Sequence, residues 1–263
     1  RLPELMTGMA HTFSLKPPLA VEARRVLEVE HLTRAGQYQD VSFTLREGEV
    51  LGLCGRLGSG RTELALSLFG MTRPDSGRIW LDTKPVHFRC HQDAIKSGVA
   101  YLSEDRLTLG LIQQQSVGDN LVLSVLDKLR NRVNLIDEDR KNQLIQAWIA
   151  RLGIRVSDPD LPVSTLSGGN QQKIVLAKWV LTRPKILILD SPTVGVDVGA
   201  KASIYRLIQQ LALEGLSIIL ISDEVPEVWY NCDRILHFRD GTIHAEYQPA
   251  CVQQQQLMEA INA

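Results

Sequence analysis

The stretch Gly55-Arg56-Leu57-Gly58-Ser59-Gly60-Arg61-Thr62 decides the fold class of this chain. It follows a short apolar run at residues 50–54 and precedes an expected helix at residues 61–69. It matches the phosphate-binding pattern Gly-x4-Gly-Lys-[Ser/Thr] at every fixed position except the lysine, which is Arg61. In such a loop the backbone N–H groups surround phosphate oxygens and the Thr62 hydroxyl reaches Mg²⁺. The alternative is a glycine-rich turn that binds nothing.

Arg61 keeps the positive charge of the missing lysine but changes its shape. A lysine ammonium is a compact point charge, whereas the arginine guanidinium is a broad planar fork. The fork can pair with phosphate oxygens but does not fit the same slot. We therefore expect nucleotide binding that is weakened or re-angled, and not abolished.

A second glycine pair lies in Leu166-Ser167-Gly168-Gly169-Asn170-Gln171-Gln172-Lys173, just before a helical run at residues 174–181. The first turn of a helix offers unpaired N–H groups and a partial positive charge, which suit an anion. Glycines there let a phosphate approach the backbone closely. The apolar run at residues 186–189 then ends in Asp190.

The rest of the chain alternates between strand-like and helix-like segments, which predicts an α/β fold with a mostly parallel sheet. An antiparallel β subdomain is expected at the start, and an inserted, mostly helical subdomain at about 105–180. There Asp137 is expected to cap a helix that ends at Leu152. Further strands are expected at 26–30, 41–45, 78–81, 99–102, 217–221, 234–238 and 242–246, and a helix at 200–213. Residues 1–25 are expected to be the linker or tail of a preceding domain, residues 26–250 the main domain, and residues 251–263 a tail helix.

Composition excludes several classes of protein. The chain has 263 residues, 44% of them hydrophobic, and a net charge of −1. A nearly neutral chain does not indicate a nucleic-acid partner. No apolar run is long enough to span a bilayer, and the start has no signal-peptide pattern. The four cysteines are widely spaced, which suggests neither a zinc site nor a disulfide framework.

Taken together, these motifs resemble the nucleotide-binding domain of an ABC transporter. The stretches Gly60–Leu64, Ser103-Glu104-Asp105-Arg106 and residues 195–201 are similar to a narrower group. That group is the second, C-terminal half of the fused double ATPase of bacterial sugar importers of the ribose/galactose/autoinducer-2 type. The resemblance extends from about residue 26 to about residue 246.

The resemblance implies that two such domains face each other and hold ATP with Mg²⁺ between them. In this chain, residues 55–62 and Asp190 would hold nucleotide, with Thr62 and Asp190 serving the Mg²⁺, and Tyr38 is the candidate to stack on adenine. The partner's nucleotide would be met by Leu166, Ser167, Gly168, Gly169, Asn170, Gln171 and Asp197. The implied partners are the other ATP-binding half, expected N-terminal in the same polypeptide, and membrane-spanning permease subunits. Together they would work at the cytoplasmic face of the bacterial inner membrane, and the segment at 103–120 would lie near the groove for the membrane subunit.

Several positions depart from an active member of that family. Arg61 replaces lysine, Ser103 a glutamine, Ser191 the glutamate that acts as general base, and Asp223 the switch histidine, while Val194 replaces a customary arginine. A serine hydroxyl cannot take a proton near neutral pH, and losing a general base costs about 10²–10⁴-fold in rate. Asp223 is expected to repel the γ-phosphate, unless it is only an exposed loop acid. The chain's own site should therefore hydrolyse ATP slowly or not at all.

Three functions remain open on these residues. The first is the energy-coupling half of a sugar importer, in which Ser167 and its glycines complete the partner's site. The second is a non-hydrolytic nucleotide-binding or assembly module, which the substitutions favour for this half alone. The third is a soluble phosphotransferase, against which the Leu166–Lys173 segment counts strongly.

Overall fold

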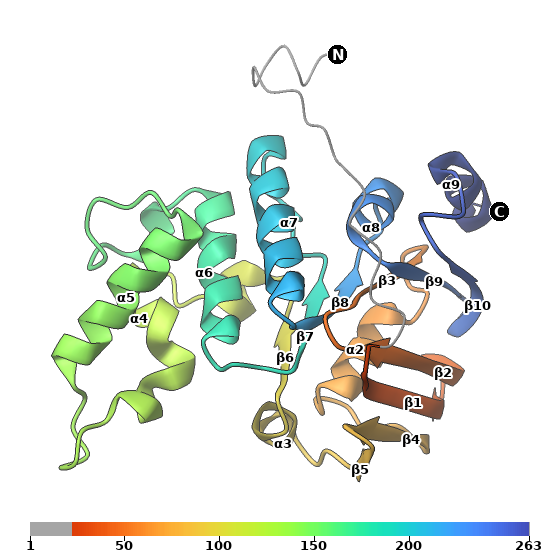
Figure 1. Cartoon of the computed structure of the whole chain (residues 1–263), viewed down its shortest axis with the longest axis horizontal. Helices are drawn as coiled ribbons and strands as arrows, with labels where there is room; N and C mark the ends of the chain where they lie inside the picture. Colours follow the sequence, from red (N-terminus) through yellow and green to blue (C-terminus); the bar gives the residue numbers. More distant parts are fainter. Residues whose placement is uncertain (1–22, 263) are drawn as a thin grey trace.

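The computed structural model describes residues 23–262, so most of the expected tail at residues 1–25 lies outside the described residues. A six-stranded sheet in the order β10-β9-β3-β8-β7-β6 forms the centre of the molecule (Figure 1). All neighbouring pairs are parallel except β10 with β9, which forms an antiparallel hairpin. The strands are β3 (Val50–Gly55), β6 (Val99–Leu102), β7 (Ile186–Asp190), β8 (Ser217–Ile221), β9 (Arg234–Arg239) and β10 (Thr242–Tyr247).

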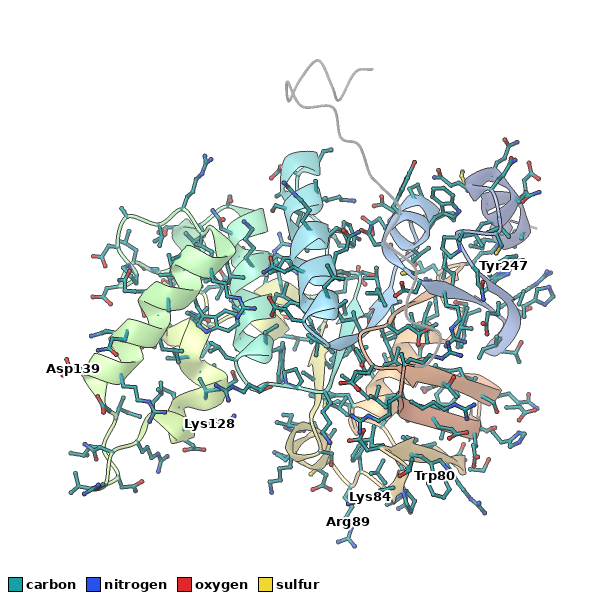
Figure 2. The ribbon with its side chains drawn as sticks, in the orientation of Figure 1. Trp80, Lys84, Arg89, Lys128, Asp139 and Tyr247 are labelled. Atoms are coloured by element: carbon teal, nitrogen blue, oxygen red, sulfur yellow. The ribbon has the colours of Figure 1, made fainter. Side chains whose placement is uncertain are left out.

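A smaller antiparallel sheet stands beside the central one, in the order β2-β1-β4-β5. Its strands are β1 (Arg25–Arg34), β2 (Tyr38–Arg46), β4 (Ser76–Leu81) and β5 (Lys84–Val86). Figure 2 places Trp80 of β4 on this sheet and Asp139 at the opposite side of the view, on the helical part. The two sheets together confirm the predicted fold class: an α/β fold with an antiparallel β subdomain at its start.

The helices fall into two groups along the chain. Those next to the sheets are α2 (Arg61–Leu68), α3 (His91–Lys96), α7 (Val198–Leu213), α8 (Val225–Asn231) and α9 (Gln254–Asn262). The helical insertion contains the π-helix η1 (Arg106–Gly110), α4 (Val117–Val122), the 3₁₀-helices η2 (Leu123–Leu129) and η3 (Val163–Thr165), α5 (Glu138–Leu152) and α6 (Gly168–Val180). In Figure 1, α4 and α5 lie at one end of the molecule, and α6 lies between them and α7.

Strand β7 shows how the central sheet is covered on both faces. Its five residues are all buried. Leu187 and Leu189 belong to the hydrophobic cluster that includes α6 and α7, whereas Ile186 and Ile188 belong to the cluster that includes α2 and the antiparallel sheet. Successive side chains of a strand point to opposite faces, so a strand buried on both faces consists of a continuous apolar run.

Sequence-based expectation and structure differ mainly at short elements. The predicted cap at Asp137 is confirmed, because its side chain accepts a hydrogen bond from the Arg140 amide at 3.1 Å. Helix α6 starts six residues before the expected run at 174–181, because Gly168 and Gly169 are themselves helical. The short elements β5, α3, η1, α4, η2 and η3 were not predicted, since pieces of three to seven residues carry too little periodicity.

Candidate functional site

The glycine-rich loop lies at the carboxyl end of β3, where the parallel strands β8 and β9 flank it. Gly60 has φ 97°, and a Cβ there would come within 2.5 Å of the Gln37 carbonyl oxygen, so only glycine fits this position. The Gly241 amide of the β9–β10 turn donates to the Ser59 carbonyl at 3.1 Å. Two turns from different sheets thus support the loop, while Leu57 at its tip is 89% exposed.

A hydrogen bond joins the side chains of Thr62 and Asp190, the two residues that the resemblance assigns to Mg²⁺. Asp190 ends β7 and is 2% exposed. Burial raises its pKa, and hydrogen bonds from the side chains of Tyr101 and Thr62 act in the opposite direction. The Tyr101 hydroxyl donates to Asp190 Oδ2 at 2.9 Å, and burial raises the tyrosine pKa well above its usual value. A hydroxyl and a carboxylate at this position are oxygen ligands that suit Mg²⁺.

Arg61 turns into the protein and not toward solvent. Its side chain is 5% exposed. Its Nε donates to Ser59 Oγ at 2.9 Å, and its Nη2 donates to the Arg56 carbonyl at 3.1 Å. Both acceptors belong to the loop itself. The guanidinium expected to bind a phosphate is therefore hydrogen-bonded to its own loop.

Asp223 pairs with Arg61, at 2.6 Å between Oδ1 and Nη2. Arg61 Nη1 also donates to the Ser222 carbonyl at 2.9 Å. The Asp223 carboxylate is thus paired with the cation of the loop in this structure, and the expected repulsion of a γ-phosphate stays a prediction. Asp223 is also not merely an exposed loop acid, although 55% of its side chain remains exposed.

Two further departures from the active pattern lie at the ends of strands. Ser191 follows Asp190 with φ 47°, and its amide donates to the Ile221 carbonyl at 2.9 Å. Its hydroxyl occupies the position at which the resemblance implies a carboxylate. Ser103 follows β6, and its Oγ accepts from the Asp105 amide at 3.3 Å.

The assignment of Tyr38 to adenine stacking does not hold. Its side chain is 2% exposed and belongs to the hydrophobic cluster between the two sheets. Its hydroxyl donates to Ser67 Oγ of α2 at 2.6 Å. A ring enclosed in this way has no free face for a base, so Tyr38 is a core residue that joins β2 to the loop helix.

The second glycine pair begins α6, directly after an exposed serine. Ser167 is the N-cap residue, is exposed, and makes no side-chain capping hydrogen bond within the described part of the chain. The first-turn amides of the 13-residue helix lack i−4 partners by geometry. Of the neighbouring residues, Gln171 is 7% exposed and donates to the Val163 carbonyl at 3.2 Å, so it links the first turn of α6 to η3. Leu166 and Asn170 are half-buried.

Arg106, whose role the sequence did not suggest, supports this helix start. Its Nη1 donates to the Val194 carbonyl at 2.6 Å and its Nη2 to the Gly195 carbonyl at 3.1 Å. A Cβ at Gly168 would lie 2.9 Å from the same guanidinium, and a Cβ at Gly169 would lie 2.4 Å from the Ala200 Cβ. The close approach of Ala200 thus requires a glycine at position 169, whereas the Arg106 side chain could shift to admit a Cβ at position 168.

Asp197 caps α7 beside this region. Its Oδ1 accepts from the Ala200 amide at 2.9 Å, and the residue is exposed. The Arg106 guanidinium bonds to the loop just before Asp197 and lies close to Gly168, so this loop and the start of α6 are neighbours. An exposed cap on this surface is consistent with the expectation that Asp197 faces a partner.

A buried glutamate network behind the site was also missed. Glu227 is 8% exposed and accepts hydrogen bonds from Thr193 Oγ1 at 2.6 Å and Ser222 Oγ at 2.6 Å. Lys201 Nζ lies 3.0 Å from the same carboxylate. This network joins the segment after β7 to the segment after β8. Its members are separated by up to 34 residues, so no local pattern pointed to it.

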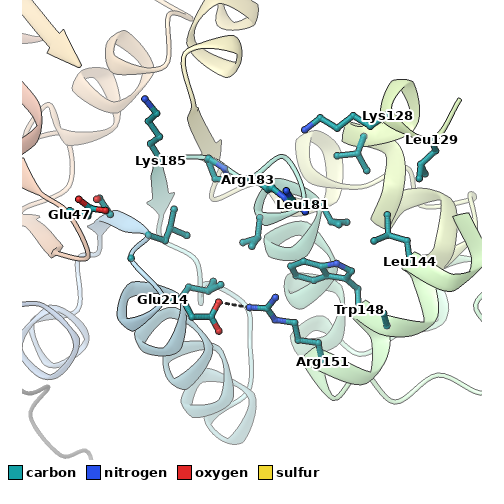
Figure 3. Close-up of a pocket in the computed structure, with 18 of the residues that line it drawn as sticks. Glu47, Lys128, Leu129, Leu144, Trp148, Arg151, Leu181, Arg183, Lys185 and Glu214 are labelled. Atoms are coloured by element: carbon teal, nitrogen blue, oxygen red, sulfur yellow. Dashed lines mark hydrogen bonds and ion pairs between the residues drawn. The ribbon is translucent and has the colours of Figure 1, made fainter. Parts of the chain in front are cut away.

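A cavity of about 980 Å³ lies elsewhere in the molecule. Its lining includes Lys185 and Ser217, which mark the amino ends of β7 and β8, together with residues of α5. Figure 3 shows Trp148 inside this cavity and the ion pair between Arg151 and Glu214 across it. Because the glycine-rich loop lies at the carboxyl ends of the strands, this cavity is not the phosphate site. No helix in the described range 23–262 is long and apolar enough to cross a membrane.

The fold and the loop define a P-loop nucleotide-binding domain with a helical insertion. The family model described as "ABC transporter" matches residues 38–194, and the chain belongs to this family.

Among curated proteins, the chain is similar to the ribose import ATP-binding protein RbsA of Geobacillus kaustophilus (strain HTA426). The two are 44% identical over 234 residues, which are 89% of this chain and 47% of that protein. It is also 40% identical to the ribose import ATP-binding protein RbsA 1 of Agrobacterium fabrum (strain C58 / ATCC 33970), over 97% of this chain and 50% of that protein. The chain thus spans about half the length of these relatives.

Solved structures show the same fold at low sequence identity. A nucleotide-free ATP-binding cassette from an ABC transporter has a TM-score of 0.75 and 19% identity, over 91% of this chain and 96% of that one. A dimeric ATP-binding cassette in a post-hydrolysis state, bound to ADP and Pi, has a TM-score of 0.70 and 17% identity, over 85% of this chain and 98% of that one.

Proposed function

We propose that this chain is one ATP-binding half of a sugar importer, and that it completes an ATP site whose phosphate loop belongs to the other half. The observation that carries the proposal is the exposed Ser167 at the start of α6, whose hydroxyl caps no amide of its own helix in the described structure. A free hydroxyl, first-turn N–H groups and the helix dipole converge there, which suits a phosphate presented from outside.

The relatives support the sugar class and the two-half arrangement. Two of them are named ribose import ATP-binding proteins, and this chain matches about half of each. A dimeric structural neighbour carries ADP and Pi. We assign the chain to the second, C-terminal half of such a protein on the similarity of residues 60–64, 103–106 and 195–201. The assembly would work at the cytoplasmic face of the bacterial inner membrane.

Chemistry at the partner's site would use this chain for charge stabilisation and not for proton transfer. N–H donors and a hydroxyl fixed before reaction stabilise the charge that develops on a transferring phosphoryl group. The Arg106 hydrogen bonds to Val194 and Gly195 would fix the loop that leads to Asp197 beside the helix start. Asp197 would meet the partner across the interface. Leu166, Asn170 and Gln171 would position the serine and glycines.

The membrane subunit would dock on the segment at residues 103–120. Three of its apolar side chains are largely exposed: Leu107 at 50%, Leu109 at 72% and Ile112 at 49%. A cluster of exposed apolar side chains indicates a surface that another protein covers. The neighbouring Arg106 links this surface to the loop at 194–195, so movement at one would reach the other.

The test uses the full-length two-half protein with its membrane subunits. Ser167→Arg should abolish transport-coupled ATP hydrolysis, because a long cation replaces the hydroxyl at the phosphate position. Ser164→Arg is the matched control, since Ser164 is exposed three residues earlier in η3. It should leave hydrolysis near the unmodified rate. Normal hydrolysis in the Ser167→Arg protein would overturn the proposal.

A second candidate function is a non-hydrolytic nucleotide-binding or assembly module. Ser191 at the position of the general base favours it for this half alone. Calorimetric titration of the chain with MgATP, combined with a turnover assay, separates the candidates. Turnover by the isolated chain near 1 s⁻¹ or faster would contradict both this candidate and the assignment of a degenerate site.

A further inference from the structure

Two departures from the phosphate-binding pattern contact each other. Arg61 stands where the pattern has lysine, and Asp223 stands where the resemblance places the switch histidine. They are 162 residues apart, yet Arg61 Nη2 and Asp223 Oδ1 lie 2.6 Å apart. Each residue alone weakens a nucleotide site. Together they form an ion pair inside it.

The hydrogen bonds of Arg61 leave little capacity for a ligand. A guanidinium has five N–H donors. Four of them are used within the protein, by Ser59 Oγ, the Ser222 carbonyl, the Arg56 carbonyl and Asp223. The side chain is 5% exposed. A phosphate could gain Arg61 only by displacing protein acceptors that already satisfy it.

The direction of these bonds matters as much as their number. Arg56 and Ser59 belong to the loop, and Ser222 and Asp223 belong to the segment after β8, so the guanidinium joins the two segments. The Asp223 carboxylate offers the guanidinium the same acceptor chemistry as a phosphate oxygen. It is 55% exposed, so it stands at the solvent side of the pair, where a nucleotide would enter.

We propose that Asp223 is an internal substitute for the terminal phosphate, and that it closes this chain's own P-loop to nucleoside triphosphates. The inference deepens the proposed function, because it rests on the assignment of this loop as a degenerate nucleotide site. An entering triphosphate would have to break the Arg61–Asp223 pair and would then face an unpaired carboxylate. Like charges placed together in this way repel each other and weaken binding.

The other residues of the phosphate loop and its Mg²⁺ site keep the expected arrangement, so a substitution of Asp223 should reverse the closure. Thr62 and Asp190 keep the side-chain contact that suits Mg²⁺. Gly60 keeps the left-handed conformation that the loop requires. Replacing Asp223 alone should therefore free Arg61 Nη2 to bind a phosphate and should restore MgATP binding. A variant that merely lost structure would not bind more tightly.

The experiment titrates the 263-residue chain with MgATP by calorimetry. Asp223→Ala and Asp223→Asn should bind at least about tenfold more tightly than the unmodified chain, which corresponds to about 1.4 kcal/mol. Asp240→Asn is the matched control. Asp240 is 93% exposed in the turn that contacts the loop through Gly241, and it does not touch Arg61. This control should bind like the unmodified chain.

The outcomes separate the closure from general charge repulsion. If Asp240→Asn tightens binding as much as Asp223→Asn, or if the unmodified chain binds as tightly as Asp223→Ala, the closure is refuted. Thermal unfolding with and without 5 mM MgATP, a concentration chosen for the assay, serves as the second readout. Only the two Asp223 variants should show a rise in Tm with MgATP. If neither Asp223→Ala nor Asp223→Asn shows this rise, the closure is also refuted.

The proposed function fails by a different result. It depends on Ser167 and on hydrolysis in the two-half protein, whereas the closure depends on nucleotide binding by this chain alone. Restored binding in Asp223→Ala should not bring turnover with it, because Ser191 still cannot act as a general base.

Discussion

Glutamate 227 offers a sharp test of how the site's framework is stabilised. Its carboxylate is 8% exposed and accepts hydroxyl hydrogen bonds at 2.6 Å from both Thr193 and Ser222. Lys201 Nζ lies 3.0 Å away. Glu227→Gln keeps the shape of the side chain but removes its charge and one of its two acceptor oxygens.

The expected cost follows from these contacts. Hydrogen bonds to a charged group contribute about 1.5–3 kcal/mol each. In the variant one hydroxyl faces an amide nitrogen and must turn, while the other keeps a weaker, neutral acceptor. Together with the lost attraction to Lys201, the free energy of unfolding should fall by about 3 kcal/mol. For a domain of this size, Tm should fall by about 6–12 °C.

The effect should depend on pH with a defined sign. Burial alone would raise the pKa of Glu227, but hydrogen bonds from Ser222, Thr193, Tyr205 and Lys201 outweigh it and leave the pKa lowered. A carboxyl with a lowered folded-state pKa stabilises the fold above its unfolded pKa of about 4.3 and loses this contribution as pH falls through the folded value. The difference between the two proteins should be full at neutral pH and should shrink below about pH 4.

Urea denaturation followed by circular dichroism measures this difference. Glu224→Gln is the control, because Glu224 pairs with the same Lys201 at 2.7 Å but is 59% exposed. An exposed ion pair contributes about 0–1 kcal/mol. If Glu227→Gln costs no more than Glu224→Gln at neutral pH, the buried network does not stabilise the site and the reasoning is wrong.

Three further predictions follow from close contacts. Gly169→Ala should destabilise the chain by about 1–3 kcal/mol in urea denaturation, because its Cβ would lie 2.4 Å from that of Ala200, and Ala200→Gly should restore most of the loss. Arg106→Lys should speed hydrogen exchange over residues 191–198, measured by mass spectrometry, because an ammonium does not reproduce the planar fork that donates to the Val194 and Gly195 carbonyls. Unchanged exchange would contradict the proposal that Arg106 stabilises this loop. Tyr38→Phe should cost about 1 kcal/mol of stability in urea denaturation through its lost hydroxyl bond to Ser67, whereas an unchanged free energy of unfolding would contradict the role of this bond.

Local signals in the sequence predicted the parts of the site that are made locally. The strand, the glycine-rich loop and the helix at residues 50–68 are consecutive, and the position of Gly60 follows from the motif alone. Thr62 and Asp190 were assigned to one Mg²⁺ only through the family resemblance, and the hydrogen bond between their side chains was found in the structure. The existence of α6 was predicted too, but its start was not, because the helix begins at Gly168, six residues before the expected run at 174–181.

What the sequence could not provide were contacts between distant segments. Arg61 and Asp223 were each recognised as unusual, but only the fold brings them together across 162 residues. Tyr38 was misassigned because an aromatic residue near the start of a strand can face either a base or the core. The choice depends on the packing of β2 against α2, which gives the hydroxyl its partner Ser67.

The opposite orientations of the two phosphate-binding elements lead to a last prediction. Ser167 is exposed, whereas Arg61 is 5% exposed and its guanidinium is hydrogen-bonded within the protein. Two copies of this chain would bring together two exposed Ser167 sites at the start of α6 but no open phosphate loop. MgATP should therefore be unable to bridge the two copies. Analytical ultracentrifugation should find the same sedimentation for the chain with and without MgATP. Asp223→Ala opens the loop and so should gain MgATP-dependent dimers, which a further Ser167→Arg change should remove. If the unmodified chain dimerises on MgATP, both the closed loop and the need for a different partner half are refuted.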